Sequence, residues 1–252
     1  MGLLYKIFSL FYRFIWRTTK VSRSFSSDGE DLIINKIFHN KRKGYYVDIG
    51  AFAPISFNNT FLFYLKGWRG VLIDPRPGFR FWARVIRPRD EVFNVGIDPD
   101  LKGNIRNKKL YIYDSCPDNN TVSEERVAKN LEVLGRKHSD ELNLSFAGFE
   151  YIINNSKILK KNIDIDVLNI DIEGVEYEVI KSIICDIRIL PKVICVEQLS
   201  MDCKNVLRTQ IYKTLSNNGY ILLSKTMLSS IYVRKEFMKN NDTPYFDNRL
   251  RA

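Results

Sequence analysis

Residues 45–74 read YYVDIGAFAPISFNNTFLFYLKGWRGVLID, and this stretch decides the fold class. Its first five residues form an apolar run that is typical of a buried parallel strand. Gly50 and Ala51 then allow a turn in which the backbone approaches a ligand closely. Residues 56–60 (SFNNT) are mostly polar and can cap a helix, and residues 70–74 predict a second strand. Strand, glycine turn, helix and strand in this order predict a site for a nucleoside cofactor.

Several polar residues in and after this stretch are candidate cofactor ligands. Asp48 lies inside the first strand, where a carboxylate is costly unless a donor or a positive charge meets it. It therefore faces a ligand, which we favour, or is paired with protein groups. Asp74 ends the second strand, where doubly wound sheets have an acid that hydrogen-bonds ribose hydroxyls. Asn59 lies in the capping segment that faces the predicted pocket. Asn94 or Val95, near the end of the next predicted strand, would line the nucleoside base.

Acids also follow two later predicted strands. The run at 165–170 is followed by Asp171 and Glu173, and the run at 193–197 ends in Glu197. The carboxyl ends of parallel strands meet at one edge of a sheet, and open α/β sheets bind their ligands at that edge. We therefore expect these acids to form a site that carries hydroxyl groups, a cation, or both.

The end of the chain distinguishes two kinds of doubly wound fold. A helix is predicted at about 206–216, followed by strands at 218–223 and 229–233. The turn between these strands is too short for a parallel crossover, so they must form an antiparallel hairpin. A simple dinucleotide-binding fold does not end in this way. Class I S-adenosylmethionine-dependent methyltransferases do, with seven strands and the last one inserted antiparallel.

Five separated segments resemble the FkbM family of methyltransferases, over about residues 30–234: YYVDIGAFAP, SFNNTFLFYLKGWRGVLIDPRPG, DVLNIDIEGVEYEVIKS, PKVICVE and GYILLSKTMLSSIYV. The resemblance implies an α/β, Rossmann-like class I methyltransferase fold with a seven-stranded, mostly parallel sheet, its last strand antiparallel and helices on both faces. It also implies S-adenosylmethionine as the methyl donor and a hydroxyl acceptor on a sugar, a glycan or a related natural product.

The resemblance also implies roles for individual residues. It places Asp48, Gly50 and Ala51 at the cofactor turn and Asp74 on the ribose, and it places Asp171 with Glu173 beside the reacting centre. Members of the family often have Asn or His after the Gly-Ala pair and a second glycine soon after. This chain has Phe-Ala-Pro at 52–54 instead.

The expected chemistry needs little beyond alignment and a base. Methyl transfer to a hydroxyl is an in-line displacement, so most of the catalysis comes from positioning. Asp171 or Glu173 is the hypothesised base, with Glu197 orienting the acceptor or sharing the proton. Alternatively, these three acids could hold a divalent cation through their oxygens. The sequence does not separate the two arrangements.

Length and pattern predict one methyltransferase domain at 25–240, preceded by a basic, aromatic segment at 1–24 and followed by a tail at 241–252. Residues 99–163 form an insertion longer than a crossover needs, and such insertions commonly bind substrate. Within it we predict a strand at 109–113, a polar turn at 118–121 and a helix at about 122–137.

Composition limits the partners. The chain has 39 Lys and Arg against 29 Asp and Glu, a formal net charge of +10. Five of the basic residues lie in the first 24 residues, which contain no acid, so the remainder carries 10 − 5 = +5. No arginine-rich patch with interleaved aromatics stands out in the body of the chain, which disfavours nucleic-acid binding. The segment at 1–24 is too short to span a bilayer, and it either lies on an anionic membrane surface or packs on the domain.

The four cysteines have no CxxC spacing, which favours a reducing compartment without zinc. We therefore expect a cytoplasmic protein, with the N-terminal segment as a candidate contact with the inner face of a membrane. The favoured function is O-methylation of a sugar, glycan or lipid-linked acceptor. The alternatives are a nicotinamide-dependent oxidoreductase, disfavoured by the missing GxGxxG motif, and a non-catalytic glycan-binding or membrane-binding module, motivated by Phe52.

Overall fold

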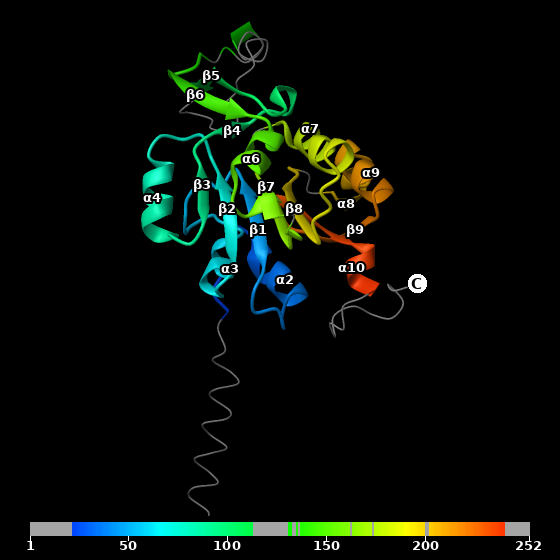
Figure 1. Ribbon diagram of the computed structural model, residues 1–252. Helices are drawn as coiled ribbons and strands as arrows, with labels where there is room; N and C mark the ends of the chain where they lie inside the picture. The colour runs from blue at the N-terminus through cyan, green and yellow to red at the C-terminus, as the bar shows by residue number, and fades with distance from the viewer. Residues whose placement is uncertain are drawn as a thin grey trace, which may run out of the picture.

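A computed structural model describes residues 22–112, 131–132, 135, 137–161, 163–172, 174–199 and 202–239. These residues form a seven-stranded sheet with helices on both faces and a separate three-stranded sheet at one end of the molecule (Figure 1). The predicted stretch at 45–74 lies in the middle of the large sheet and supplies two of its neighbouring strands.

The large sheet has the order β3-β2-β1-β7-β8-β10-β9. Its strands are β1 (Tyr45–Ile49), β2 (Arg69–Ile73), β3 (Glu91–Phe93), β7 (Val167–Ile170), β8 (Val193–Glu197), β9 (Tyr220–Lys225) and β10 (Ser229–Arg234). The pairs from β3 through β8 are parallel, whereas β10 runs antiparallel to both β8 and β9. The last strand is therefore inserted between two strands of the opposite direction, which confirms the predicted class I methyltransferase fold.

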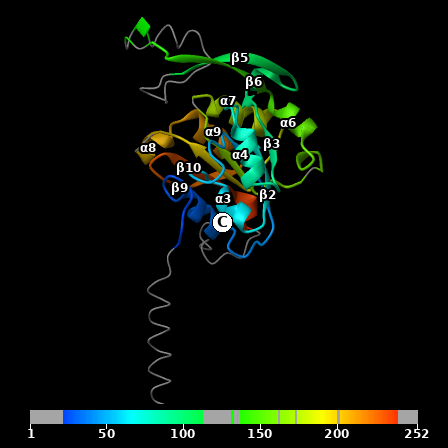
Figure 2. The ribbon, with the colours of Figure 1, turned by 90° about the vertical axis from the view of Figure 1, so that its left-hand side faces the viewer.

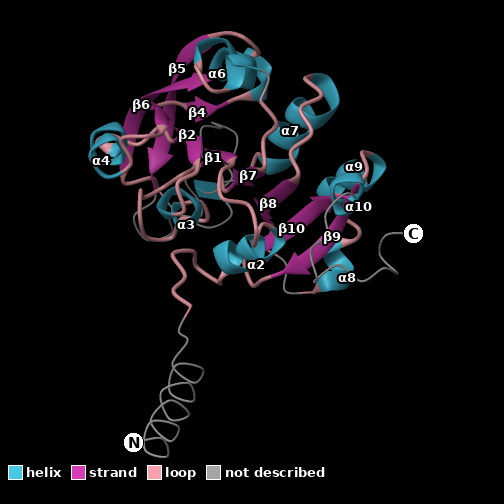
Figure 3. Ribbon diagram, turned by 60° about the horizontal axis from the view of Figure 1, so that its bottom comes forward, coloured by secondary structure: helices cyan, strands magenta, loops and turns pink. Residues whose placement is uncertain are grey.

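Helices cover both faces of this sheet: α2 (Glu30–Ile37), α3 (Phe61–Leu65), α4 (Phe79–Ile86), α6 (Phe149–Asn155), α7 (Glu176–Lys181), α8 (Cys203–Val206), α9 (Gln210–Asn217) and α10 (Lys235–Lys239). Successive strand residues point to opposite faces. Tyr46 and Val167 accordingly join a core with α2, α3, α4 and α10, whereas Val47 and Leu168 join a core with α6, α7 and α9. Figure 3 shows α2 beside β10, on the side of the molecule away from β5 and β6.

The insertion predicted at 99–163 supplies most of the second sheet. This sheet has the order β4-β6-β5, with β4 (Gly96–Ile97), β5 (Ile105–Ile112) and β6 (Asp140–Ala147). It projects beyond the main sheet, above α4 and α7, in both Figure 1 and Figure 2. A short 3₁₀ turn at Pro99–Leu101 lies between β4 and β5, and another at Leu159–Lys161 follows α6.

One predicted element is wrong in detail. The helix expected at about 206–216 is divided into α8 and α9, because Thr209 lies between them as the cap of α9 and its hydroxyl accepts a hydrogen bond from the Tyr212 N–H at 3.1 Å. The predicted turn at 118–121, most of the helix predicted at 122–137, residues 1–21 and residues 240–252 lie outside the described residues. Within the described part of the chain, no helix combines the length and apolar character that a bilayer crossing requires.

A buried ion pair joins the end of α4 to the sheet. Arg87 and Asp90 are both fully buried at their side chains, and the Arg87 Nε donates to Asp90 at 2.8 Å. The Tyr46 hydroxyl donates to Asp90 at 2.6 Å, and the Arg87 guanidinium also donates to Thr60 at 3.0 Å and Asn58 at 3.1 Å. Burial raises the pKa of Asp90, and the charge of Arg87 opposes that rise. Removing either side chain would therefore leave the other as a buried, uncompensated charge and would destabilise the fold.

Replacing Arg87 with Met should lower the free energy of unfolding by about 3–5 kcal/mol, because it leaves the Asp90 carboxylate buried without its cation. Arg84, exposed on the same helix, provides a matched control, and Arg84→Met should change stability by less than about 0.5 kcal/mol. Urea unfolding followed by circular dichroism measures both. Equal stability of the two variants would contradict the structural role of the Arg87 ion pair.

Candidate functional site

Asp48 is the centre of a buried polar row that crosses the sheet. In register, Asp48 of β1 pairs with Asn169 of β7, which pairs with Cys195 of β8. Asp48 and Cys195 are fully buried, and Asn169 is 3% exposed. One Asp48 carboxylate oxygen accepts a hydrogen bond from Asn169 at 2.8 Å, and the other accepts from Asn58 at 3.0 Å and Thr60 at 2.6 Å. Both oxygens of this carboxylate are therefore occupied by protein donors.

These hydrogen bonds fix the loop between β1 and α3. The Asn58 amide also donates to the carbonyl of Ala51 at 3.0 Å, and the Asn59 amide donates to Asn169 at 2.9 Å. Asp48 thus fixes the loop through hydrogen bonds. Its carboxylate is paired with protein groups, which is the alternative that the sequence analysis did not favour. That Asp48, Ala51 and Asn59 contact a cofactor stays a prediction.

Gly50 allows the loop to approach the end of β7. Its φ is +80°, and a Cβ atom at this position would lie 1.7 Å from the carbonyl oxygen of Asp171. The N–H groups of Gly50 and Ala51 both donate to the carbonyl of Ile73, at 2.9 and 3.2 Å. Only glycine fits this position, and the carboxyl ends of β1, β2 and β7 meet there.

Asp74 lies at the end of β2 and is 3% exposed. Its carboxylate accepts two hydrogen bonds from the Arg76 guanidinium, at 2.9 and 2.7 Å, and one from the Phe52 N–H at 2.9 Å. The guanidinium carbon of Arg76 also lies 3.8 Å from the centre of the Phe52 ring. The Arg76 side chain is 35% exposed whereas that of Asp74 is 3% exposed, so Arg76 lies between the Asp74 carboxylate and the solvent.

Asn94 and Val95, the residues predicted to line the base, follow directly after β3. The Asn94 amide donates to the carbonyls of Asp74 at 2.7 Å and Arg76 at 2.9 Å. Asn94 therefore braces the turn that carries Asp74. Val95 is 7% exposed and belongs to the core on the α6 and α7 side.

Acidic groups gather where β7 and β8 end. The carboxyl groups of Asp171 and Glu197 lie close enough to share a hydrogen bond when one of them carries a proton, and the pKa of Asp171 is raised to about 6. Loss of hydration is the main cause, although the residue as a whole is exposed, and the negative charges of Asp48 and Glu30 add to it. The hydrogen bond with Glu197 and the charge of Arg76 act in the opposite direction. The structure thus brings two of the three predicted catalytic acids together, and Glu173 lies outside the described residues.

Glu30 is a further member of this acidic cluster. Its place at the start of the helix before the first strand makes it a minor candidate for a pocket contact from the sequence, where a role in favouring the helix dipole is preferred. Glu30 begins α2, is 1% exposed, and accepts hydrogen bonds from the Thr226 hydroxyl at 2.6 Å and the Asp28 N–H at 2.9 Å. Thr226 lies in the turn between β9 and β10, so the N-terminal helix is fastened to the closing hairpin at this edge. The sequence carries the helix cap that marks Glu30, but not its distance from Asp171.

The sequence analysis did not name four residues of this region as site residues: Asn58, Thr60, Arg76 and Asn169. A polar Asn inside the otherwise apolar run VLNI was the available indication for Asn169. For Arg76, the sequence placed a cation two residues after Asp74 without indicating that the two would pair.

Two shallow hollows lie near this edge. One, of about 410 Å³, is bounded by the loop at 52–56, Arg76 and the start of α4. The other, of about 480 Å³, lies along α4. Neither is lined by Asp171 or Glu197, so the hollows do not by themselves define the reacting centre. Among the described residues, no group of three His, Cys, Asp or Glu side chains has an arrangement suited to a metal ion.

The sequence matches the profile described as the methyltransferase FkbM domain over residues 48–222, more than half of the 252 residues. The chain belongs to this family. The match begins at Asp48 and ends within β9, so it includes the buried polar row, the Asp74 turn and the acidic pair. No curated protein sequence matches the chain.

Several solved structures are similar to this FkbM-domain protein. A TehB-like SAM-dependent methyltransferase from Corynebacterium glutamicum is 9% identical, with 91% of this chain and 97% of that chain covered and a TM-score of 0.41. A methyltransferase from Geobacter sulfurreducens is 12% identical, with 91% and 90% covered and a TM-score of 0.41. Likeness at this level concerns the fold alone.

The acidic cluster predicts the titration of Asp171. Carboxyl-carbon NMR should show Asp171 titrating with a midpoint near pH 6. Glu30→Gln should lower that midpoint, because a negative charge that favours the protonated form is removed. Glu178→Gln, an exposed acid on α7, should leave it unchanged. A midpoint that is the same in wild type and both variants would exclude the coupling between Glu30 and Asp171.

Proposed function

We propose that this protein is an S-adenosylmethionine-dependent O-methyltransferase that acts on a hydroxyl group of a sugar, a glycan or a lipid-linked sugar. One observation supports it most directly. The paired carboxyl groups of Asp171 and Glu197, with a raised pKa at Asp171, lie at the carboxyl edge of the sheet of an FkbM-domain protein. An acid of this kind can accept a hydroxyl proton near neutral pH.

The residues at the edge of the sheet suit the proposed cofactor. S-adenosylmethionine supplies a methyl group on a positively charged sulfur. The carboxylates of Glu30, Asp48 and Asp171 make this edge negative, which favours a cationic ligand. Gly50 brings the backbone of the β1 loop close to the end of β7, and Asp74 offers two oxygens for the ribose hydroxyls. Asp74 can do so only when Arg76 turns away from it.

Asp171 would act as the base. Above its pKa of about 6 it is ionised and can receive the proton of the acceptor hydroxyl as the oxygen becomes a nucleophile. Once Asp171 has received the proton, Glu197 can share it through a hydrogen bond between the two carboxyl groups. Asp48, with both oxygens occupied, fixes the loop and adds negative charge. Alignment of the acceptor then contributes most of the rate.

The second sheet is the proposed acceptor platform. Its strands β5 and β6 carry exposed polar side chains, and the Ser145 hydroxyl donates to Asn107 at 2.9 Å. Such hydroxyl and amide groups suit hydrogen bonding to sugar hydroxyls. A lipid-linked sugar would place the enzyme at the inner face of a membrane, where residues 1–24 are the proposed peripheral contact.

One observation favours a second candidate, a non-catalytic module on a methyltransferase fold. The Asp74 carboxylate is engaged by Arg76 and by the N–H of Phe52, the residue at which this chain departs from the family pattern. If Arg76 holds Asp74 permanently, no ribose can bind there.

The ribose assignment can be tested with two neighbouring substitutions. Asp74→Asn should weaken S-adenosylmethionine binding about a hundredfold, because two hydrogen bonds to a charged acceptor are lost. Arg76→Ala should bind at least as tightly as wild type, because it frees the Asp74 oxygens. Isothermal titration calorimetry measures both. Unaltered affinity in Asp74→Asn would exclude the ribose role, and no binding by wild type would favour the non-catalytic module.

The base assignment can be tested by transfer of a labelled methyl group to a cell-envelope extract. The rate for wild type should rise with pH through about pH 6, because Asp171 must be ionised to accept a proton. Asp171→Asn should lose about 10²–10⁴-fold of the rate and should no longer show this rise. Glu178→Gln is the matched control. A chelator should leave the wild-type rate unchanged, and restoration by magnesium after chelation would favour the cation arrangement instead.

A further inference from the structure

Helix α4 exposes apolar side chains along the middle of its solvent-facing side. Phe81 is 63% exposed, Trp82 57% and Val85 58%. Phe79 and Ala83, on the opposite side of the helix, are buried against the sheet at 5% and 0% exposure. Helices that cover a sheet normally turn polar residues outward, so α4 reverses the usual pattern on its outer face.

These side chains form one surface. The rings of Phe81 and Trp82 are in edge contact, with centroids 5.2 Å apart. Trp82 also borders the 410 Å³ hollow whose other wall includes Phe52 and Ile55, which are 55% and 38% exposed. The apolar surface therefore runs from α4 to the β1 loop beside Asp74. Contiguous exposed apolar surface of this kind marks a contact with another body.

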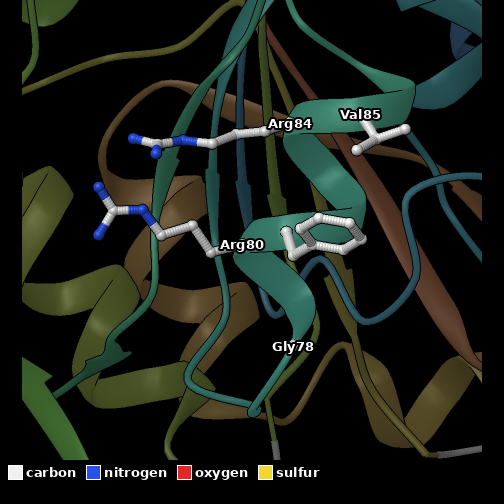
Figure 4. Close-up of a pocket in the computed structure, with 5 residues that line it drawn as sticks. Gly78, Arg80, Arg84 and Val85 are labelled. Atoms are coloured by element: carbon white, nitrogen blue, oxygen red, sulfur yellow. The ribbon is translucent and has the colours of Figure 1, made fainter.

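Positive charge flanks this apolar surface. Figure 4 shows the side chains of Arg80 and Arg84 extending to one side of α4, with Val85 on the other. The two arginines and Val85 border the 480 Å³ hollow along the helix. No acid occurs between Asp74 and Asp90, and Asp90 is itself buried against Arg87. The segment that carries this flank therefore contributes positive charge and no exposed carboxylate.

The positive charge of Arg80 and Arg84 indicates which kind of partner would bind the exposed face of α4. A second copy of the chain packed on this face would bring the same arginines and no acid from residues 75–89, so it would offer the arginines no opposite charge from this segment. A bilayer with anionic lipids offers phosphates to the arginines and an interfacial zone to the aromatic rings. The net charge of +10 adds a general attraction to such a surface.

We propose that Arg80, Phe81, Trp82, Arg84 and Val85, called the α4 surface, dock on a membrane leaflet that contains anionic phospholipids. Docking through this surface brings the β1 loop, and with it the carboxyl edge of the sheet, next to the leaflet. The proposal goes beyond methyl transfer and does not depend on it, because vesicle binding is measured without cofactor or acceptor.

Sedimentation with vesicles tests the α4 surface in the full-length protein. Wild type should bind phosphatidylcholine vesicles that contain phosphatidylglycerol more tightly than vesicles of phosphatidylcholine alone. The double variant F81S/W82S should bind the anionic vesicles about tenfold more weakly or worse, because the apolar area inserted at the interface is lost. The double variant R80Q/R84Q should lose about fivefold for each charge removed, and only on the anionic vesicles.

The variant L207S/R208Q is the matched control, because Leu207 is 46% exposed and Arg208 is exposed beside it between α8 and α9. It should bind as wild type does. Circular dichroism and thermal unfolding of every variant separate lost docking from lost folding. Three results would overturn the proposal: wild type that ignores anionic vesicles, α4 variants that bind as the control does, or a wild-type dimer that α4 variants convert to monomers.

Discussion

The rest of the structure depends on one buried charge, the carboxylate of Asp48 in the central strand. A carboxylate at 0% exposure is tolerated only when hydrogen-bond donors meet it, and Asn169, Asn58 and Thr60 all do so. Two of these donors belong to the loop that follows β1, so satisfying the charge also fixes the loop. Arg87, a buried cation, donates to the same two residues and interacts electrostatically with Asp48. The hydrogen-bonding requirement of one buried side chain thus fixes the loop between β1 and α3.

The same charge acts on Asp171 through space. Asp48 contributes to the raised pKa of Asp171, second only to the loss of hydration, and Glu30 adds to it from the first turn of α2. Like charges held near one another favour the protonated form of the member that can most easily take up a proton. A cationic ligand at this edge would relieve that repulsion. The buried Asp48 carboxylate therefore has two effects: it fixes the loop after β1, and it raises the pKa of Asp171.

The Asp74 turn and the α4 surface lie next to each other and differ in whether their side chains are paired within the protein. The Asp74 carboxylate accepts hydrogen bonds from Arg76 and from the Phe52 N–H, and the Asp74 carbonyl accepts one from the Asn94 amide. On α4, by contrast, Phe81, Trp82 and Val85 are left uncovered. Polar contacts within the protein thus cover the Asp74 carboxylate, whereas the apolar side chains of the α4 surface face solvent.

The sequence by itself determined the fold class, because the 45–74 stretch, the acids at strand ends and the short turn of the closing hairpin are local patterns with a fixed physical meaning. It also determined that Asp74, Asp171 and Glu197 lie at one edge. Only the tertiary structure decided that Asp48 is paired, that Arg76 covers Asp74 and that Glu30 lies near Asp171. These depend on side chains from distant segments meeting across strands and loops. The periodicity of one segment carries no information about which neighbour it meets.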